Sequence, residues 1–231
     1  VNATQLSQWV KVDDDMNVVF DETAVKAYIQ SLADKYDTKG KQRTFTSASG
    51  NTVTVSGGSY GWKIDQSAEY NALIANIQSG ESVTREPNYS SRAASHEGYD
   101  VGNTYAEVNL STQHMYFVKD GQIALETDVV TGNPNKGNST PAGVYSLAYK
   151  AKDQFLRGTK KADGTYEYET PVSYWMPFNG GIGFHDASWQ PTFGGSRYLT
   201  NGSHGCVNMP PAMAAQLFNL ISAGTPVVVH N

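Results

Sequence analysis

The chain has 231 residues, enough for one large domain or two small ones. Its 17 Lys and Arg against 22 Asp and Glu give a net charge of −5 without any basic cluster, which argues against a nucleic-acid partner. No window of about 18 apolar residues predicts a membrane-spanning helix. The chain starts at Val1 without a methionine, and we expect any secretion signal or membrane anchor to lie upstream of it.

The first 102 residues predict a small α+β domain. Helical spacing of apolar residues predicts two helices, and alternation with Gly-rich turns predicts short strands around them. The expected elements, in chain order, are two strands within 9–20 joined by an acidic turn, a helix over 21–36, a β-hairpin over 43–55, a helix over 66–78 and a strand over 81–87. Residues 88–102 are rich in Ser, Ala and Gly and predict a linker.

Residues 103–231 predict a second, mostly β domain. Alternating segments and the Asp120-Gly121 turn indicate hairpin-linked strands. Within 150–180, a polar hairpin followed by an aromatic strand would suit a flap over a site. A helix over Ala212–Ser222, opened by Pro210-Pro211, and a last strand over Thr225–His230 complete the domain.

The chemistry is expected around Cys206, which is the only cysteine of the chain. A single thiol cannot form an intramolecular disulfide, and it lies in a glycine-rich run with a histidine, His204, two positions before it. A second histidine, His185, lies in another Gly-rich segment 21 positions upstream. Because a free thiol is mostly protonated at neutral pH, a nucleophilic cysteine needs such a base nearby.

His185 is the better candidate for that base. His204, only two positions before Cys206, is too local to be assigned as the base and receives a positioning or substrate-contact role, whereas His185 comes from a different strand and can approach the sulfur across the site. Either Ser203 or Asp186 is expected to orient His185. Gly205 lets the backbone bend so that the N–H groups of Gly205 and Cys206 face a developing oxyanion.

The same residues would also fit two other kinds of site. The first is an inert buried cysteine, which is common for a free thiol. The second is a zinc site made of Cys206, His204 and His185, but structural zinc sites usually contain more thiols. A nucleophile is favoured over both, with no metal and no cofactor. Asn208 is expected to brace the loop or contact substrate, and further pocket candidates are the aromatic and apolar residues Tyr174, Trp175, Met176, Phe178, Trp189 and Tyr198.

The run Ser203-His204-Gly205-Cys206-Val207-Asn208, preceded by His185 and 17 intervening residues, resembles the signature of the L,D-transpeptidase catalytic domain family. The Ser139-Thr140-Pro141-Ala142-Gly143 turn is also similar to that family. The resemblance covers about residues 104–231 and implies a sandwich-like β fold for the predicted domain 103–231. The stretch Tyr60–Asp65 gives residues 1–102 a weaker resemblance to a peptidoglycan-binding domain.

This resemblance implies a cysteine acyltransferase of the bacterial cell wall. Cys206 would attack the carbonyl between the third residue and the fourth, D-Ala, of a peptidoglycan tetrapeptide stem, with His185 as base and acid and with Ser203 and His204 in the site. An amine of a second stem would complete a 3→3 cross-link, and Asp186 is a candidate contact for that amine. Such enzymes bypass D,D-transpeptidases, confer β-lactam resistance and are acylated by carbapenems.

The resemblance also implies a place in the cell and leaves alternatives open. We expect a monomer on the cell wall face of the plasma membrane, with a membrane helix upstream. An L,D-carboxypeptidase or cell-wall peptidase would use the same Cys/His site with water as acceptor, and a non-catalytic wall-binding protein would retain the fold alone.

Overall fold

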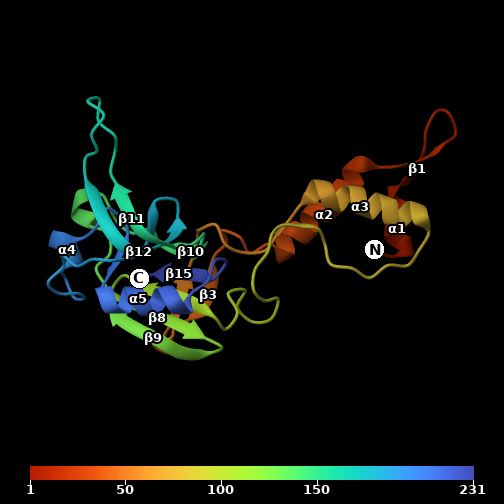
Figure 1. Cartoon of the computed structure of the whole chain (residues 1–231). Coiled ribbons are helices and arrows are strands. Elements are labelled where there is room, and N and C mark those ends of the chain that lie inside the picture. Colours follow the sequence, from red (N-terminus) through yellow and green to blue (C-terminus); the bar gives the residue numbers. More distant parts are fainter. The chain divides into compact units, whose positions relative to one another are not determined.

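The computed structural model describes residues 1–231, which divide into two compact units. The N-terminal unit comprises residues 1–39 and 61–92, and the C-terminal unit comprises residues 40–60 and 93–231. The predicted α+β fold class is confirmed, and sheets dominate the C-terminal unit (Figure 1). The division differs from the expected boundary at residue 102, because the predicted hairpin over 43–55 packs with the C-terminal unit.

The N-terminal unit is built around two helices. Asp21 and Asp65 begin them, since each carboxylate accepts the backbone N–H of the residue three positions on. Trp9, Val25 and Ile29 lie at the centre of its apolar core. Its elements are α1 (Ala3–Trp9), β1 (Val10–Val12), β2 (Val18–Phe20), α2 (Glu22–Tyr36), β5 (Lys63–Ile64), α3 (Gln66–Ser79) and β6 (Tyr89–Ser91).

The predicted strand over 81–87 is wrong. That segment is exposed and has no strand partner, whereas β6, which follows it, pairs antiparallel with β5. Alternation alone does not provide a partner, and Pro87 removes a backbone donor that a ladder would need. The helix α1 was also not predicted. None of the helices in either unit is long and apolar enough to cross a bilayer.

The C-terminal unit consists of two packed sheets. One has the order β10-β15-β7-β8-β9, and the other has the order β11-β12-β13-β14. The core lies between them and is formed by side chains of both sheets and of α5, including Phe117, Phe184 and Leu217. The strands are β7 (Tyr105–Asn109), β8 (His114–Lys119), β9 (Gln122–Asp128), β10 (Gly143–Ser146), β11 (Ala151–Arg157), β12 (Glu169–Asn179), β13 (Ile182–Asp186), β14 (Val207–Met209) and β15 (Pro226–His230), and the helices are η1 (Pro134–Lys136), α4 (Tyr198–Asn201) and α5 (Pro211–Leu220).

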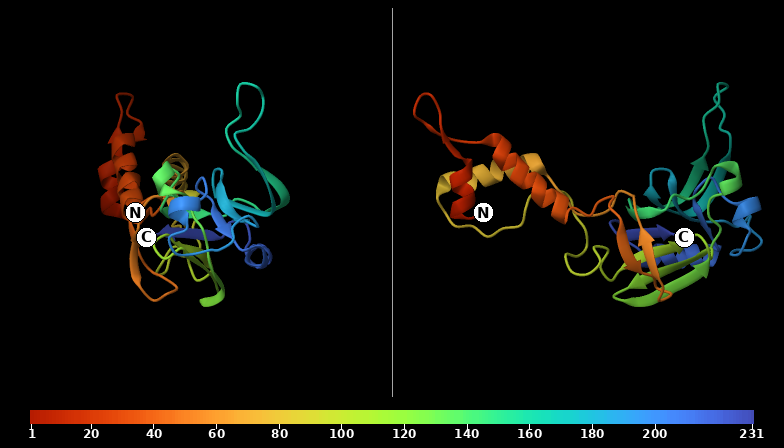
Figure 2. Two further views of the ribbon diagram at one scale, coloured as in Figure 1. Left: turned by 90° about the vertical axis from the view of Figure 1, so that its left-hand side faces the viewer. Right: turned by 180° about the vertical axis from the view of Figure 1, so that it is seen from behind.

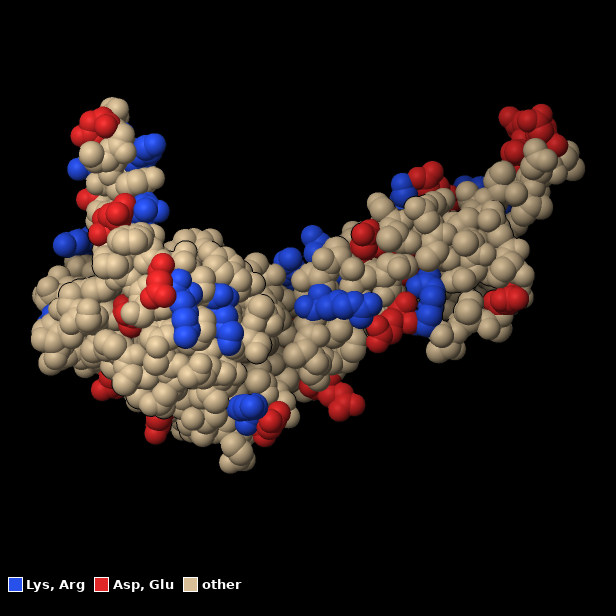
Figure 3. Space-filling model, viewed as in Figure 1, with Lys and Arg blue, Asp and Glu red and all other residues tan.

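The predicted polar hairpin is formed by β11 and β12, which pair antiparallel. Its tip projects from the C-terminal unit in every view (Figures 1 and 2). Figure 3 shows acidic and basic side chains together along this projection. The strand alternation that continues down β12 carries Trp175 toward one face of its sheet and Tyr174 and Met176 toward the other.

A buried charged cluster joins the hairpin of β3 (Arg43–Thr46) and β4 (Thr52–Val55) to the sheet of the C-terminal unit. Glu107, on β7, is fully buried and accepts hydrogen bonds from the Ser47 hydroxyl and, at 2.8 Å, from the Ala48 N–H. His230, on β15, lies 2.9 Å from the same carboxylate and is also buried. Burial lowers the pKa of His230, but hydrogen bonds to Glu107 and the Asn231 carbonyl outweigh it and raise that pKa.

We expect Glu107→Ala to lower the free energy of unfolding by about 3–5 kcal/mol, because the substitution leaves His230 buried without its partner. A raised folded-state pKa means that the charged pair stabilises the protein fully below the ordinary histidine pKa. Its contribution is lost as pH rises through the folded-state value. Urea unfolding of the wild type and of Glu107→Ala, from below the ordinary histidine pKa to above the folded-state pKa of His230, measures the difference in the free energy of unfolding.

The matched control is Glu126→Ala. Glu126 also faces a histidine, His114, at 3.6 Å, but its side chain is 58% exposed. An exposed pair contributes at most about 1 kcal/mol. Equal losses in the two variants would contradict the role given to the buried cluster.

Candidate functional site

The site is organised by the parallel pairing of β13 with β14. In this register His185 lies beside Asn208, and Phe184 lies beside Val207. Paired residues share a face and neighbours along a strand alternate, so Phe184 and Val207 enter the core while His185 and Asn208 face the opposite side. Cys206 comes directly before β14 and two residues before Asn208, which places it on the same face as His185.

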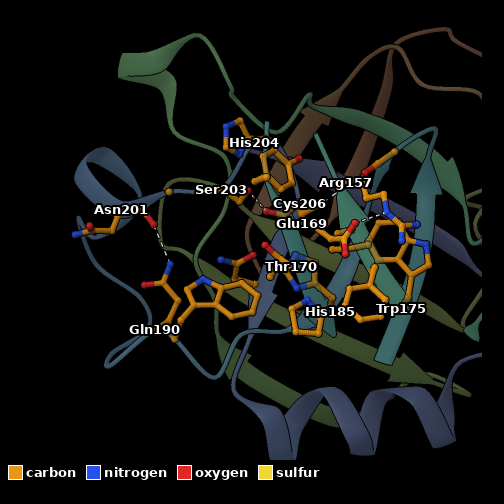
Figure 4. A pocket seen from close by; sticks show the side chains of 18 of the residues that line it. Arg157, Glu169, Thr170, Trp175, His185, Gln190, Asn201, Ser203, His204 and Cys206 are labelled. Atoms are coloured by element: carbon orange, nitrogen blue, oxygen red, sulfur yellow. Dashed lines mark hydrogen bonds and ion pairs between the residues drawn. The ribbon is translucent and has the colours of Figure 1, made fainter. Parts of the chain in front are cut away.

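These residues open into a cleft of ≈ 900 Å³. Figure 4 shows Cys206 and His185 at its centre, with the Gln190–Asn201 pair on one side and Arg157, Glu169 and Trp175 on the other. The sequence-predicted residues that line it are Cys206, His185, Ser203, His204, Trp175, Asn208 and Trp189. Residues of the β11–β12 hairpin and of the η1 and α4 segments form most of the remaining lining, together with Tyr149, Gly180, Gly181, Gln190 and Gly202.

His185 has one ring nitrogen fixed and the other available. Its Nδ1 lies 2.9 Å from the backbone carbonyl of Asp186. A carbonyl only accepts hydrogen bonds, so Nδ1 carries the proton and Nε2 presents a lone pair. Burial lowers the pKa of His185, which keeps the ring neutral at pH 7. Thus the main chain of Asp186, rather than the Ser203 or Asp186 side chain, orients the imidazole.

The Cys206 thiol rests in its protonated form. Burial raises the pKa of Cys206 to about 11, against a smaller lowering by a hydrogen bond with the Gly183 backbone. The sulfur donates to the Gly181 carbonyl at 3.5 Å. No hydrogen bond joins Cys206 to His185, so the resting pair is a neutral thiol beside a neutral imidazole.

The loop that carries Cys206 is held by side chains on both sides. The Ser203 hydroxyl donates to the Cys206 carbonyl at 2.6 Å and accepts the Gly205 N–H at 3.0 Å. The expected use of the Gly205 N–H in an oxyanion hole is therefore wrong, because that donor is occupied. The Cys206 N–H has no acceptor within the chain and remains available.

Aromatic rings surround the two histidines separately. The indoles of Trp175 and Trp189 lie 6.1 Å and 5.9 Å from the His185 ring, close enough to favour an imidazolium when it forms. His204 instead stacks on Tyr168 at 4.7 Å, at the cleft rim. No three His, Cys, Asp or Glu side chains of the chain are grouped as metal ligands.

Five predicted pocket residues do not line the cleft; of these, Phe178 is buried in the core and Tyr198, in α4, lies outside the lining. The other three are expected substrate contacts on β12 and β13. Met176 is fully buried in the core, and the Tyr174 ring packs on Phe218 of α5. The Asp186 carboxylate is buried and accepts the Tyr174 N–H at 2.8 Å. Strand alternation is the reason, because each residue is one position away from a cleft-facing neighbour, Trp175 or His185.

Other lining residues were missed. Lys136, Glu169 and Arg197 enter the cleft from segments without any catalytic pattern. Thr140, in the turn that carried part of the family resemblance, does not line the cleft but donates a hydrogen bond to the carbonyl of Gly205. The polar hairpin predicted within 150–180 indicated that a flap covers the site. It did not identify Arg157 or Glu169 as residues that line the cleft.

Comparison with known proteins agrees with this geometry. A family model described as the L,D-transpeptidase catalytic domain matches residues 103–229, and a peptidoglycan binding domain model matches residues 2–85. The structure is similar to that of a cysteine-to-serine mutant of the Enterococcus faecium L,D-transpeptidase. The TM-score is 0.84 and the identity is 39%, over 100% of this chain and 90% of that one. The Ldtfm–avibactam carbamoyl enzyme gives the same values, with 88% of that chain covered.

L,D-transpeptidase 1 of Mycobacterium tuberculosis is 25% identical over 143 residues, which are 58% of this chain and 53% of that protein. The chain thus matches about half the length of this curated relative. With both models matched, the chain belongs to the L,D-transpeptidase catalytic domain family and carries a peptidoglycan-binding domain at its N-terminal end.

The raised pKa of Cys206 predicts how its alkylation depends on pH. Iodoacetamide reacts with the thiolate, whose fraction grows about tenfold per pH unit below the pKa. We expect the alkylation rate to climb from pH 6.5 to 9.5 without a plateau near 8.5, measured by mass spectrometry with Cys206→Ala as background. A plateau below pH 8 would instead indicate a thiolate stabilised by imidazolium.

Proposed function

We propose that the chain is an L,D-transpeptidase that forms 3→3 cross-links between peptidoglycan tetrapeptide stems through a Cys206 acyl-enzyme. The observation that carries this proposal is the shared cleft face of Cys206 and His185, with the fixed tautomer of His185 and the available Cys206 N–H. A nucleophile, a base oriented by a third group, and an oxyanion donor are the parts that acyl transfer requires.

In the first half-reaction, His185 Nε2 accepts the Cys206 proton as the sulfur attacks the carbonyl between the third residue and D-Ala. The Cys206 N–H donates to the oxyanion that forms on that carbonyl. His185 then returns the proton to the nitrogen of the leaving D-Ala, and a thioester remains on Cys206. Because both groups are neutral at rest, proton transfer accompanies the attack.

In the second half-reaction, an amine of another stem replaces D-Ala in the cleft. His185 removes a proton from this amine, the amine attacks the thioester, and the thiol leaves with a proton. Water in place of the amine would give a tripeptide, the reaction of an L,D-carboxypeptidase.

The cleft also suits an anionic group of the donor. Glu169 is the one acid in the lining and is already paired with Arg157 at 2.7 Å. Lys136 and Arg197 also line the cleft and have no acidic partner within 4.0 Å; Arg197 donates instead to the Gln190 amide oxygen at 2.8 Å. We propose that these two cations bind the terminal carboxylate of the donor D-Ala, in place of the amine contact expected at Asp186.

The same proposal includes where the protein acts and what inhibits it. Residues 2–85, matched by the peptidoglycan-binding model, would hold the enzyme at the cell wall, as a monomer anchored through an upstream segment. β-Lactams, carbapenems among them, would acylate Cys206 as substrate analogues, so the enzyme would bypass D,D-transpeptidases and confer resistance. The carbamoyl enzyme that avibactam forms on the relative Ldtfm supports covalent inhibition.

Incubation with a disaccharide-tetrapeptide tests the function. We expect cross-linked dimers and free D-Ala from the wild type, and loss of both in Cys206→Ala, because no thioester can form. In His185→Ala we expect about a 10²–10⁴-fold lower rate from the lost base. Mass spectrometry of the products decides the acceptor: tripeptides without dimers would identify a carboxypeptidase. An ertapenem adduct on Cys206→Ala would contradict the nucleophile.

The carboxylate contact has its own test. In the double variant Lys136→Ala/Arg197→Ala we expect KM for the tetrapeptide to rise about tenfold, the effect of about 1.4 kcal/mol of lost binding. With a tetrapeptide that ends in D-alaninamide, wild type and variant should have similar KM values. Lys119→Ala, on an exposed strand end, is the control cation. An equal effect on both substrates would exclude the proposed contact.

A further inference from the structure

Thr140 belongs to the turn before β10 and has no part in the mechanism described so far. Its side chain is buried, with 3% of the residue exposed. Its hydroxyl lies 2.7 Å from the Gly205 carbonyl and 2.9 Å from the Gly132 nitrogen. Because an N–H only donates, Thr140 accepts from Gly132, and its single proton goes to the carbonyl of Gly205. Both bonds of the hydroxyl therefore have a fixed direction.

This hydrogen bond fixes the peptide between Gly205 and Cys206. A trans peptide is planar, so its C=O and N–H point in opposite directions. With the Gly205 carbonyl held by Thr140, the Cys206 N–H must point away from Thr140. That N–H has no hydrogen-bond acceptor within the chain. Its direction is thus set by a side chain 66 positions earlier in the sequence.

The peptide needs such a restraint because its preceding residue is a glycine with unusual freedom. Gly205 has a φ of 121°, outside the range that other residues adopt readily. A peptide next to such a residue rotates more easily than one between two bulky residues. A rotation of this peptide would turn the Cys206 N–H away from the substrate while leaving the thiol in place.

The segment around Gly132, whose N–H donates to the Thr140 hydroxyl, is itself held by hydrogen bonds. Gly132 and Ser203 form an isolated parallel β-bridge. The Ser203 N–H donates to the Thr131 carbonyl, and the Asn133 N–H donates to the Ser203 carbonyl, each at 3.0 Å. A Cβ at Gly132 would lie 2.9 Å from Gly205 Cα, which shows how closely the two backbones approach. Thr140 thus links the Gly205 carbonyl to a closely packed segment that two backbone hydrogen bonds with Ser203 hold in place.

We propose that Thr140 is a positioning residue that holds the Cys206 N–H toward the oxyanion of the acyl-transfer reaction. The proposal rests on the proposed function, because an oxyanion forms only in attack on a carbonyl. Thr140 itself is buried behind the loop and does not line the cleft. It acts only through the orientation of the Gly205–Cys206 peptide.

Two reagents separate the orientation of the N–H from the reactivity of the thiol. Ertapenem acylates through a tetrahedral oxyanion, whereas iodoacetamide alkylates an sp³ carbon and forms none. We expect Thr140→Val to lower the ertapenem acylation rate by about 10–100-fold, below the 10²–10³-fold typical of removing an oxyanion donor outright. Alkylation by iodoacetamide at pH 9 should stay within about twofold of wild type, and Thr140→Ser should restore acylation.

Tyr145→Phe is the matched control for a general loosening of the turn. The Tyr145 hydroxyl bonds to the carbonyls of the same turn, Pro141 and Ala142, at 3.2 Å, and does not touch Gly205. It should acylate like the wild type. Thr140→Ala serves if the valine variant does not fold, as judged by its melting temperature.

The proposal would be overturned by a folded Thr140→Val that acylates within twofold of wild type. It would also be overturned by an equal acylation loss in Tyr145→Phe, or by a parallel loss of alkylation in Thr140→Val. Failure of the proposed function has a different signature, since the wild type itself would then form no ertapenem adduct and no cross-linked dimer.

Discussion

The parallel pairing of β13 with β14 is the constraint on which the site depends. Its register decides that His185, Asn208 and Cys206 leave the sheet on one face while Phe184 and Val207 enter the core on the other. A shift by one residue would exchange these sets, placing the imidazole in the core and phenylalanine in the cleft. Burial of Phe184 and Val207 in the apolar core opposes any slip of the two strands, and it thereby keeps His185 and Cys206 on the cleft face.

The same burial that secures the register sets the protonation of the two groups. Removing thiol and imidazole from water disfavours the charged form of each, so the pKa of Cys206 rises and that of His185 falls. The pair is consequently uncharged at rest, and the sulfur bonds to the Gly181 carbonyl instead of to His185. Charge develops only when a carbonyl is attacked. The surrounding groups are then most useful where they stabilise charge during the reaction: the indoles at His185 and the N–H of Cys206.

Local sequence patterns predicted the two helices of the N-terminal unit, the hairpin over 43–55, the flap and the Cys206–His185 pair, because each depends on spacing or chemistry within a short segment. Tyr174, Met176 and Asp186 were assigned to the cleft by proximity in sequence, but alternation sends them to the other face, and the phase of a strand depends on which face meets the core. The grouping of residues 40–60 with the C-terminal unit depends on the buried Glu107, which no local pattern relates to Ser47. Long-range pairings of this kind are decided by tertiary burial.

Thr140 connects the turn before β10 to the Cys206 loop through its hydrogen bond to the Gly205 carbonyl. Because the resting thiol is neutral, negative charge develops only during the attack. The activation barrier for acylation therefore depends strongly on how well hydrogen-bond donors stabilise the oxyanion. The Cys206 N–H belongs to a peptide next to a glycine with φ 121°, and a glycine there cannot hold that peptide by itself. Ser203 binds the Cys206 carbonyl and the Gly205 N–H, and Thr140 binds the Gly205 carbonyl, so the peptides on both sides of Gly205 and the carbonyl after Cys206 are restrained. Gly205 lets the loop turn toward the cleft but leaves its peptides free to rotate. The hydroxyl groups of Ser203 and Thr140, from two separate segments, restrain them.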